Sequence, residues 1–321
     1  MSGSPTTGPA PMVVPRRRRP LVTVKDFAWL LYVYPGRWIA SILPAGAVRL
    51  AGRITELLCQ FLMRQDKKKT VARLARALGP EVSERELRRI ARTWAANGVR
   101  YAFHRLARKR SESSARHRRV EVRGLEHLQE AVAAGHGAIL VSGHFFAGRL
   151  IRPALAELGY PAMGVRGGRL REWGLGQLGK KLVQPELRRV WGDGNRDHVL
   201  VDDPDCVLKI AKRLRSGGLV SLRLDVPFSR NVVERPFLGA RFRFSTGFLE
   251  IARQTGCAVV PVLAVSAGST FAVSLDPPLR LRPAATREDF ISESLPLLVS
   301  RLEFWIRQYP DQWEPWLSLE P

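Results

Sequence analysis

The sequence predicts an α/β fold in which a mixed, mostly parallel sheet is flanked by helices. From about residue 120 onward, short apolar runs alternate with helix-like segments, and the first three of these helices end at a glycine. This alternation is typical of a sheet with helices on both faces. We expect strands at 138–142, 161–165, 219–224, 259–265 and 271–275. We expect helices at 147–158, 203–217, 245–255 and 292–308.

Three regions are predicted along the chain. Residues 1–26 read as a disordered basic arm, because they are rich in Pro, Gly, Ser and Thr and contain four successive arginines. Residues 27–65 read as a membrane-associated helical anchor, and residues 66–321 as an α/β domain that begins with helices. In that first helical part, Ser83 followed by Glu86 matches a capping box.

The predicted anchor is apolar and aromatic, but prolines interrupt it. A membrane span needs roughly 20 apolar residues, and 27–48 contains a single charged residue together with two tryptophans and two tyrosines. We therefore favour an interfacial or partly inserted helix over a clean span. Two ordinary core helices remain the alternative.

The charge of the chain favours an anionic partner. There are 52 Lys and Arg against 29 Asp and Glu, a formal net charge of +23. Nucleic acid, anionic lipid and an acidic carrier protein would all suit such a field, and an arginine-rich solvated surface is the alternative. The three cysteines, Cys59, Cys206 and Cys257, suggest neither a disulfide framework nor a metal site, which favours a reducing, cytosol-facing location.

Two phosphate-loop patterns overlap at 174–181 (GLGQLGKK), but no strand precedes them and Lys181 stands where a Ser or Thr is needed. No serine-hydrolase elbow and no zinc-binding histidine pair is present. A metal or cofactor is therefore not expected.

His144 is the leading candidate for chemistry. The sequence Ser142-Gly143-His144 follows the buried strand expected at 138–142. Ligands gather at this edge of an open α/β sheet, and a histidine there can accept a proton from an attacking hydroxyl. An ordinary hydrogen-bonded loop histidine is the alternative.

Several stretches in order resemble one family. ILVSGHFFAGRLIRPALAELGYP resembles the catalytic block of the lipid A biosynthesis lauroyl/myristoyl acyltransferases, and phosphatidylinositol mannoside acyltransferases are similar. GGLVSLRLDVPF, then RPFLGARFRFSTGFLEIARQTGCAVVPVLAV, resembles the second half of the family, and YPDQWEPW (309–316) its ending. The resemblance covers residues 27–316. It implies a glycerolipid acyltransferase-like domain at the cytoplasmic face of the bacterial inner membrane.

The resemblance also implies an activity. An acyl thioester, on acyl carrier protein or coenzyme A, would donate its chain to a hydroxyl or amine of a membrane lipid, with His144 as general base. An anionic membrane surface is then an expected partner, and nucleic acid is not expected. A basic nucleic-acid-binding protein remains the rival from another class.

One departure from the family pattern concerns the histidine. The family has an acid five residues after the histidine, where this chain has Arg149. Three interpretations follow. Asp225 substitutes, because parallel strand ends converge on one edge; or His144 works alone while Arg149 binds a phosphate or the donor; or the chain binds lipid or a partner without transferring an acyl group. The alternative role for Asp225 is purely structural: it would cap the turn that follows its strand.

Further arginines are predicted to bind substrate. Arg166 and Arg169 follow a predicted strand, and Arg235 and Arg241 flank the sequence Phe237-Leu238-Gly239. Guanidinium groups suit phosphates, so we include these four with Arg149 and Gly239 in the predicted substrate-binding set. Solvated surface arginines are the alternative.

Overall fold

The central feature is a seven-stranded sheet with the strand order β1-β9-β8-β2-β5-β3-β4. The computed structural model describes residues 20–31, 33–34, 64–106, 120–167, 175–191, 197–225, 231–268, 270–281 and 286–319. The strands are β1 (Val120–Arg123), β2 (Ala138–Ser142), β3 (Ala162–Arg166), β4 (His198–Leu200), β5 (Leu219–Arg223), β8 (Ala258–Ala267) and β9 (Thr270–Leu275). All neighbouring strands pair in parallel except β8 with β9. The predicted mixed, mostly parallel sheet is confirmed.

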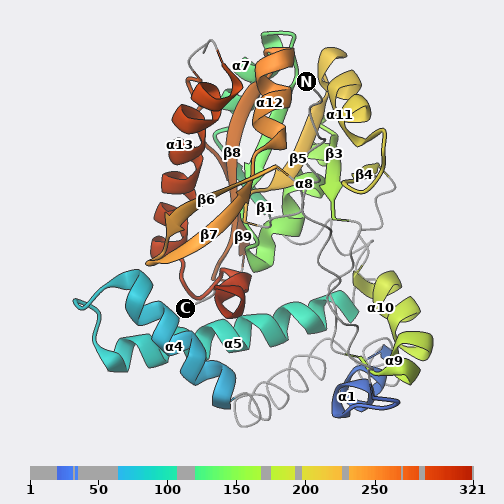
Figure 1. Cartoon of the computed structure of the whole chain (residues 1–321), viewed down its shortest axis with the longest axis vertical. Coiled ribbons are helices and arrows are strands. Elements are labelled where there is room, and N and C mark those ends of the chain that lie inside the picture. Colours follow the sequence, from blue (N-terminus) through green and yellow to red (C-terminus); the bar gives the residue numbers. More distant parts are fainter. Residues whose placement is uncertain are drawn as a thin grey trace, which may run out of the picture.

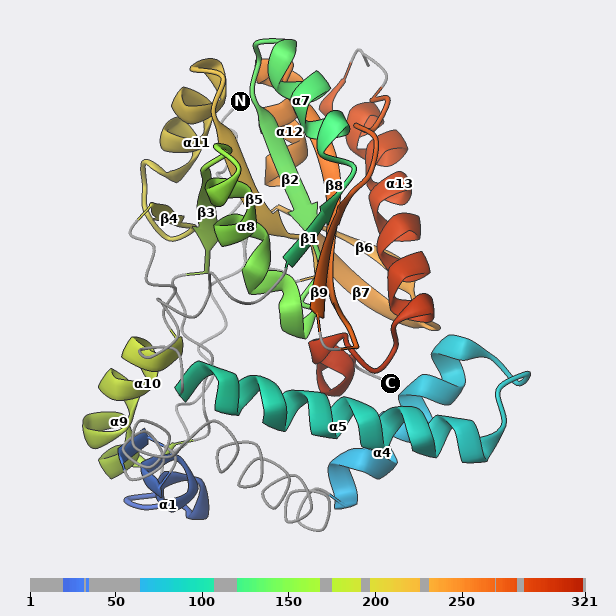
Figure 2. The same cartoon turned by 180° about the vertical axis from the view of Figure 1, so that it is seen from behind.

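Helices cover both faces of the sheet, as predicted (Figures 1 and 2). The helices α7 (Leu125–Ala133) and α8 (Ile151–Glu157) pack on one face, and α11 (Cys206–Arg215), α12 (Gly247–Thr255) and α13 (Arg287–Gln308) on the other. Every residue of β2 is buried, because this strand lies between both layers. Such burial explains its uninterrupted apolar sequence.

Some boundaries differ from those expected. The helix expected at 147–158 is a 3-10 turn, η3 (Phe146–Leu150), followed by α8. The helix α13 begins five residues earlier than expected, because the Thr286 side chain caps it by accepting a hydrogen bond from the Asp289 backbone.

A hairpin not predicted from the sequence lies against α13. It comprises β6 (Val232–Phe237) and β7 (Ala240–Ser245), which form a separate two-stranded sheet. Leu238 and Gly239 make its turn with φ values of 51° and 72°, the conformation that a two-residue hairpin turn requires. The buried Leu238 anchors this turn, and its backbone N–H donates to Glu303 Oε1 at 2.6 Å.

Two helices cross the molecule beyond the C-terminal ends of the central strands (Figure 2). They are α4 (Arg64–Leu78) and α5 (Glu84–Leu106). The predicted cap of α5 is present, since the Glu86 backbone N–H donates to Ser83 Oγ at 3.3 Å.

The N-terminal region contributes a short helix, α1 (Val24–Leu31), that packs on α9 (Gln177–Leu182). Nearby lies α10 (Gln184–Trp191). Within the part of the chain that the structure describes, no helix combines the length and apolar character needed to cross a membrane. Residues 1–19 and 35–63 lie outside the described residues, so the predicted arm and the larger part of the predicted 27–65 anchor stay predictions.

Candidate active site

The ends of β2 and β5 bring His144 and Asp225 together. These strands are parallel and in register, with Ser142 opposite Arg223, so the residues that follow them leave the sheet at the same edge. There, His144 Nδ1 lies 2.6 Å from Asp225 Oδ1. The imidazole is 20% exposed and the carboxylate is fully buried. The pair therefore reaches the surface only through the histidine ring.

The Asp225 carboxylate has two further hydrogen bonds. Its Oδ2 accepts from the backbone N–H of His144 at 2.7 Å and from the indole N–H of Trp313 at 2.7 Å. Complete burial alone would raise the pKa of Asp225. The opposite charge and hydrogen bonds of His144, together with the Trp313 indole, outweigh burial and hold this pKa below its ordinary value. Asp225 is therefore a carboxylate near neutral pH.

A glycine makes the close approach of the two residues possible. A Cβ atom on Gly143 would lie 2.6 Å from Leu302 Cδ1 and 3.3 Å from Asp225 Oδ2. The first distance is shorter than van der Waals contact allows. A side chain at this position would therefore require either the buried Leu302 side chain or the His144 loop to move.

The C-terminal segment holds the same loop from the other side. The Glu314 backbone N–H donates to the His144 carbonyl at 2.7 Å, and the Phe146 N–H donates to the Gln312 carbonyl at 3.0 Å. Phe145 and Trp313 form an isolated antiparallel bridge. These backbone contacts fix His144 between the sheet edge and the turn η4 (Glu314–Ser318), which lies below that edge in Figure 1.

Arg149, five residues after His144, lies in η3. Its guanidinium carbon is 6.0 Å from the centre of the Tyr101 ring on α5, a distance at which a cation–π contact is possible. The carboxylate that contacts the His144 imidazole comes instead from Asp225, at the end of a neighbouring strand.

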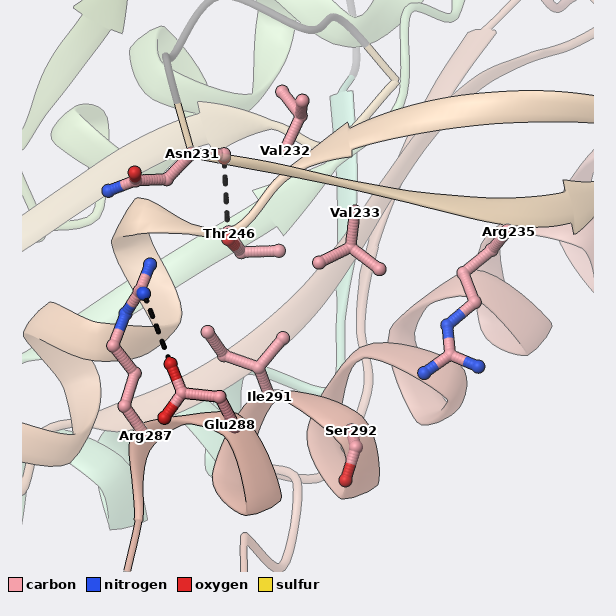
Figure 3. Close-up of a pocket in the computed structure, with 9 residues that line it drawn as sticks. All are labelled: Asn231, Val232, Val233, Arg235, Thr246, Arg287, Glu288, Ile291 and Ser292. Carbon is pink, nitrogen blue, oxygen red and sulfur yellow. Dashed lines mark hydrogen bonds and ion pairs between the residues drawn. The ribbon is translucent and has the colours of Figure 1, made fainter. Parts of the chain in front are cut away.

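Arg235 lines a pocket between the β6–β7 hairpin and the first turns of α13 (Figure 3). The cavity has a volume of about 380 Å³. The Arg235 Nε is buried without a hydrogen-bond partner among the described residues. The rest of the wall mixes apolar and polar side chains: Asn231, Val232, Val233, Thr246, Arg287, Glu288, Ile291 and Ser292.

The other predicted binding residues are more scattered. Arg166 ends β3, which pairs in parallel with β5, so it lies at the same sheet edge as Asp225. Arg241 is exposed and forms an ion pair with Glu234. Gly239 packs on α4, where an added Cβ would lie 2.6 Å from Arg76 Cγ. This close contact and the positive φ of the hairpin turn explain why the position is a glycine. Arg169 lies outside the described residues.

Trp313 is a site residue that the sequence reasoning did not single out. The motif YPDQWEPW contains it, but nothing in the spacing of that motif links it to a strand end 88 residues earlier. Within the described residues, no group of three or more His, Cys, Asp or Glu side chains could hold a metal ion.

A family model described as bacterial lipid A biosynthesis acyltransferase matches residues 16–318, which is nearly the whole chain. No curated protein matches the chain.

Proposed function

Because the chain belongs to the bacterial lipid A biosynthesis acyltransferase family, we propose that it moves a fatty acyl chain from an acyl thioester to a membrane lipid, with His144 as general base. The observation that carries this proposal is the contact of His144 with the buried, ionised Asp225. A base and its orienting carboxylate are the minimum machinery for activating a hydroxyl.

The geometry suits a two-step acyl transfer. Asp225 Oδ1 accepts the Nδ1–H of His144, so the ring Nε2 is left to take the acceptor's proton. The acceptor oxygen attacks the thioester carbonyl carbon and forms a tetrahedral intermediate. The carbon–sulfur bond then breaks, and the departing thiolate takes the proton from the imidazolium. The negative Asp225 stabilises that imidazolium while it exists.

The acyl donor is expected to be anionic, on either acyl carrier protein or coenzyme A. The net charge of +23 favours both carriers. Arg166, at the sheet edge shared with Asp225, and Arg235, in the pocket of Figure 3, are the arginines that we propose for phosphate groups of donor or acceptor. No cofactor is required by this chemistry.

We also propose that the protein acts at the cytoplasmic face of the inner membrane, and exposed apolar side chains on α1 and α9 support contact with a membrane surface. Asp26 on α1 accepts a hydrogen bond at 2.9 Å from the backbone N–H of Gly176, which directly precedes α9. Large apolar side chains face solvent around this junction, and we call them the apolar patch: Leu21, Phe27, Leu31, Tyr34, Leu178 and Leu182. Lys180 and Lys181 are exposed beside them. Apolar side chains flanked by lysines are typical of a surface that enters the headgroup region of an anionic bilayer.

The test of the activity is direct transfer. Detergent-solubilised protein is incubated with radiolabelled acyl carrier protein or acyl coenzyme A and a lipid A precursor or host lipid extract. The wild type should label a lipid, and His144→Ala should reduce the rate at least about 10²-fold. His136→Ala, in an exposed turn, is the matched control and should keep full activity. No labelled lipid with any donor would overturn the proposal.

The membrane surface is tested separately with vesicles that contain anionic phospholipid. The variants Phe27→Asp and Leu178→Asp should lower co-sedimentation, because a charge in the apolar patch opposes insertion. The control is Leu208→Asp, since Leu208 is also exposed but lies on α11. Equal binding of all variants would exclude the apolar patch as the docking surface.

A further inference from the structure

We propose that Trp313 is a positioning residue for the catalytic pair, and that its indole N–H fixes the orientation in which Asp225 contacts His144. The proposal rests on the proposed function, because it concerns how the general base is held. It extends the active site to the C-terminal segment of the chain, 88 residues beyond Asp225.

The first observation is that the two carboxylate oxygens of Asp225 have different hydrogen-bond partners. Oδ2 accepts two hydrogen bonds, from the Trp313 indole and the His144 backbone, both at 2.7 Å. Oδ1 contacts the His144 ring at 2.6 Å. Two donors on Oδ2 prevent rotation of the carboxyl group about its Cβ–Cγ bond. The remaining oxygen is therefore directed at the imidazole.

The rigidity of Trp313 is the second observation. Its side chain is fully buried, and its carbonyl accepts a hydrogen bond from the indole of Trp94 on α5 at 2.9 Å. Its ring meets Trp316 edge to face at a centroid distance of 4.9 Å, and Phe237 at 5.9 Å. An indole packed on several sides can hold its N–H in one direction without losing much further side-chain entropy.

Continuity with the histidine loop is the third observation. Glu314, the next residue, donates its backbone N–H to the His144 carbonyl at 2.7 Å. The segment around Trp313 thus contacts both members of the pair, Asp225 through a side chain and His144 through the backbone. A displacement of this segment would disturb both residues together.

Neighbouring tryptophans show what a purely structural indole does here. Trp316 donates its N–H to the Pro310 carbonyl, and Trp94 donates to the Trp313 carbonyl. Both satisfy a backbone acceptor. Of these three indoles, that of Trp313 donates to a side chain of the proposed catalytic pair, so Trp316 provides a matched control for loss of an indole from the same cluster.

The kinetic test compares Trp313→Phe with Trp316→Phe in the full chain. Loss of a hydrogen bond to a buried carboxylate should lower kcat about tenfold to a hundredfold, with KM for donor and acceptor unchanged within about twofold. The Trp316→Phe variant keeps an aromatic ring against Trp313 and removes the hydrogen bond to the Pro310 carbonyl, so it should unfold at a lower temperature and keep its kcat. If Trp313→Phe fails to fold, Trp313→benzothienylalanine keeps the ring shape and removes only the N–H. Wild-type kcat in a folded variant without the N–H would overturn the proposal.

A spectroscopic test separates this proposal from the proposed function. In protein labelled with ¹⁵N at the tryptophan indoles, the Trp313 signal is assigned by its absence in Trp313→Phe. The Asp225→Asn variant should move that signal, and Asp202→Asn, an exposed control, should not. An unmoved signal refutes the Trp313–Asp225 contact, whatever the activity. A moved signal with no acyl transfer by the wild type would leave the contact standing and refute the proposed function.

Discussion

Replacement of Asp225 by asparagine tests how the carboxylate acts on His144. Asparagine has nearly the same shape, but one of its two polar atoms is a donor. Three N–H groups point at the carboxylate: the His144 backbone, the Trp313 indole and the ring Nδ1. The backbone and the indole can only donate, so they select the amide oxygen. The amide nitrogen is then left facing the imidazole.

This arrangement reverses the histidine tautomer. Nδ1 must accept a hydrogen bond from the new amide, so the ring proton moves to Nε2, the atom that should accept a proton from the acceptor lipid. The corresponding change in a serine protease lowers kcat about 10⁴-fold. We expect a loss of about 10³-fold to 10⁴-fold in the acyl-transfer rate for Asp225→Asn.

The fold should survive this change. Asparagine still satisfies the two donors that meet Oδ2, whereas Asp225→Ala would leave all three N–H groups without their acceptor. Each unsatisfied buried group costs about 1–3 kcal/mol. We therefore expect Asp225→Ala to be several kcal/mol less stable than Asp225→Asn.

The assay is single-turnover transfer of labelled acyl chain, with thermal unfolding measured on the same samples. Asp225→Asn should be folded and nearly inactive. A folded Asp225→Asn variant with a transfer rate within about threefold of the wild type would show that Asp225 does not act by setting the His144 tautomer.

Three further predictions concern stability. Gly143→Ala should lower the unfolding temperature and the activity, since the new Cβ meets Leu302 and overpacking costs about 1–3 kcal/mol; Gly247→Ala, which meets nothing within 4 Å, is the control and should be neutral or stabilising. The lowered pKa of Asp225 contributes stability that is present above pH about 4 and is lost as the pH falls through the folded-state value. Urea unfolding should therefore show the wild type losing its advantage over Asp225→Asn in acid, and a constant difference would contradict this. Gln312→Ala should cost about 1–2 kcal/mol in urea unfolding, because the side chain makes two hydrogen bonds to the backbone of β8; an unchanged midpoint would show that water replaces them.

The five inner strands of the sheet were predictable because each is an apolar run in the sequence, whereas the short strands β1 and β4 at its two ends were not expected. A strand buried on both faces, such as β2, reads as an unbroken apolar run. The β6–β7 hairpin was missed because its sequence, VVERPF then ARFRFS, mixes charges into both strands. Its turn is Leu-Gly rather than the Asn-Gly that predicts a hairpin. Burial of Leu238 against the core explains why leucine occupies that turn.

The part of the site that lies at the ends of parallel strands was predictable from the sequence. Both His144 and Asp225 follow strands of the predicted sheet, so their convergence on one edge was expected, and the structure brings them into contact. The Trp313 indole was not predictable in this way. It follows a helix and a turn, and only the tertiary packing of α13 and η4 carries it to Asp225.

Acyl transfer by His144 can be tested on the lipids of the cell. Lipid extracts are compared by mass spectrometry between cells with the wild-type chain and cells with His144→Ala, at equal protein levels. We expect that one lipid class loses the mass of a single acyl chain in the His144→Ala cells, while its underacylated precursor accumulates. Identical lipid profiles in the two strains would contradict the claim that this histidine transfers an acyl group.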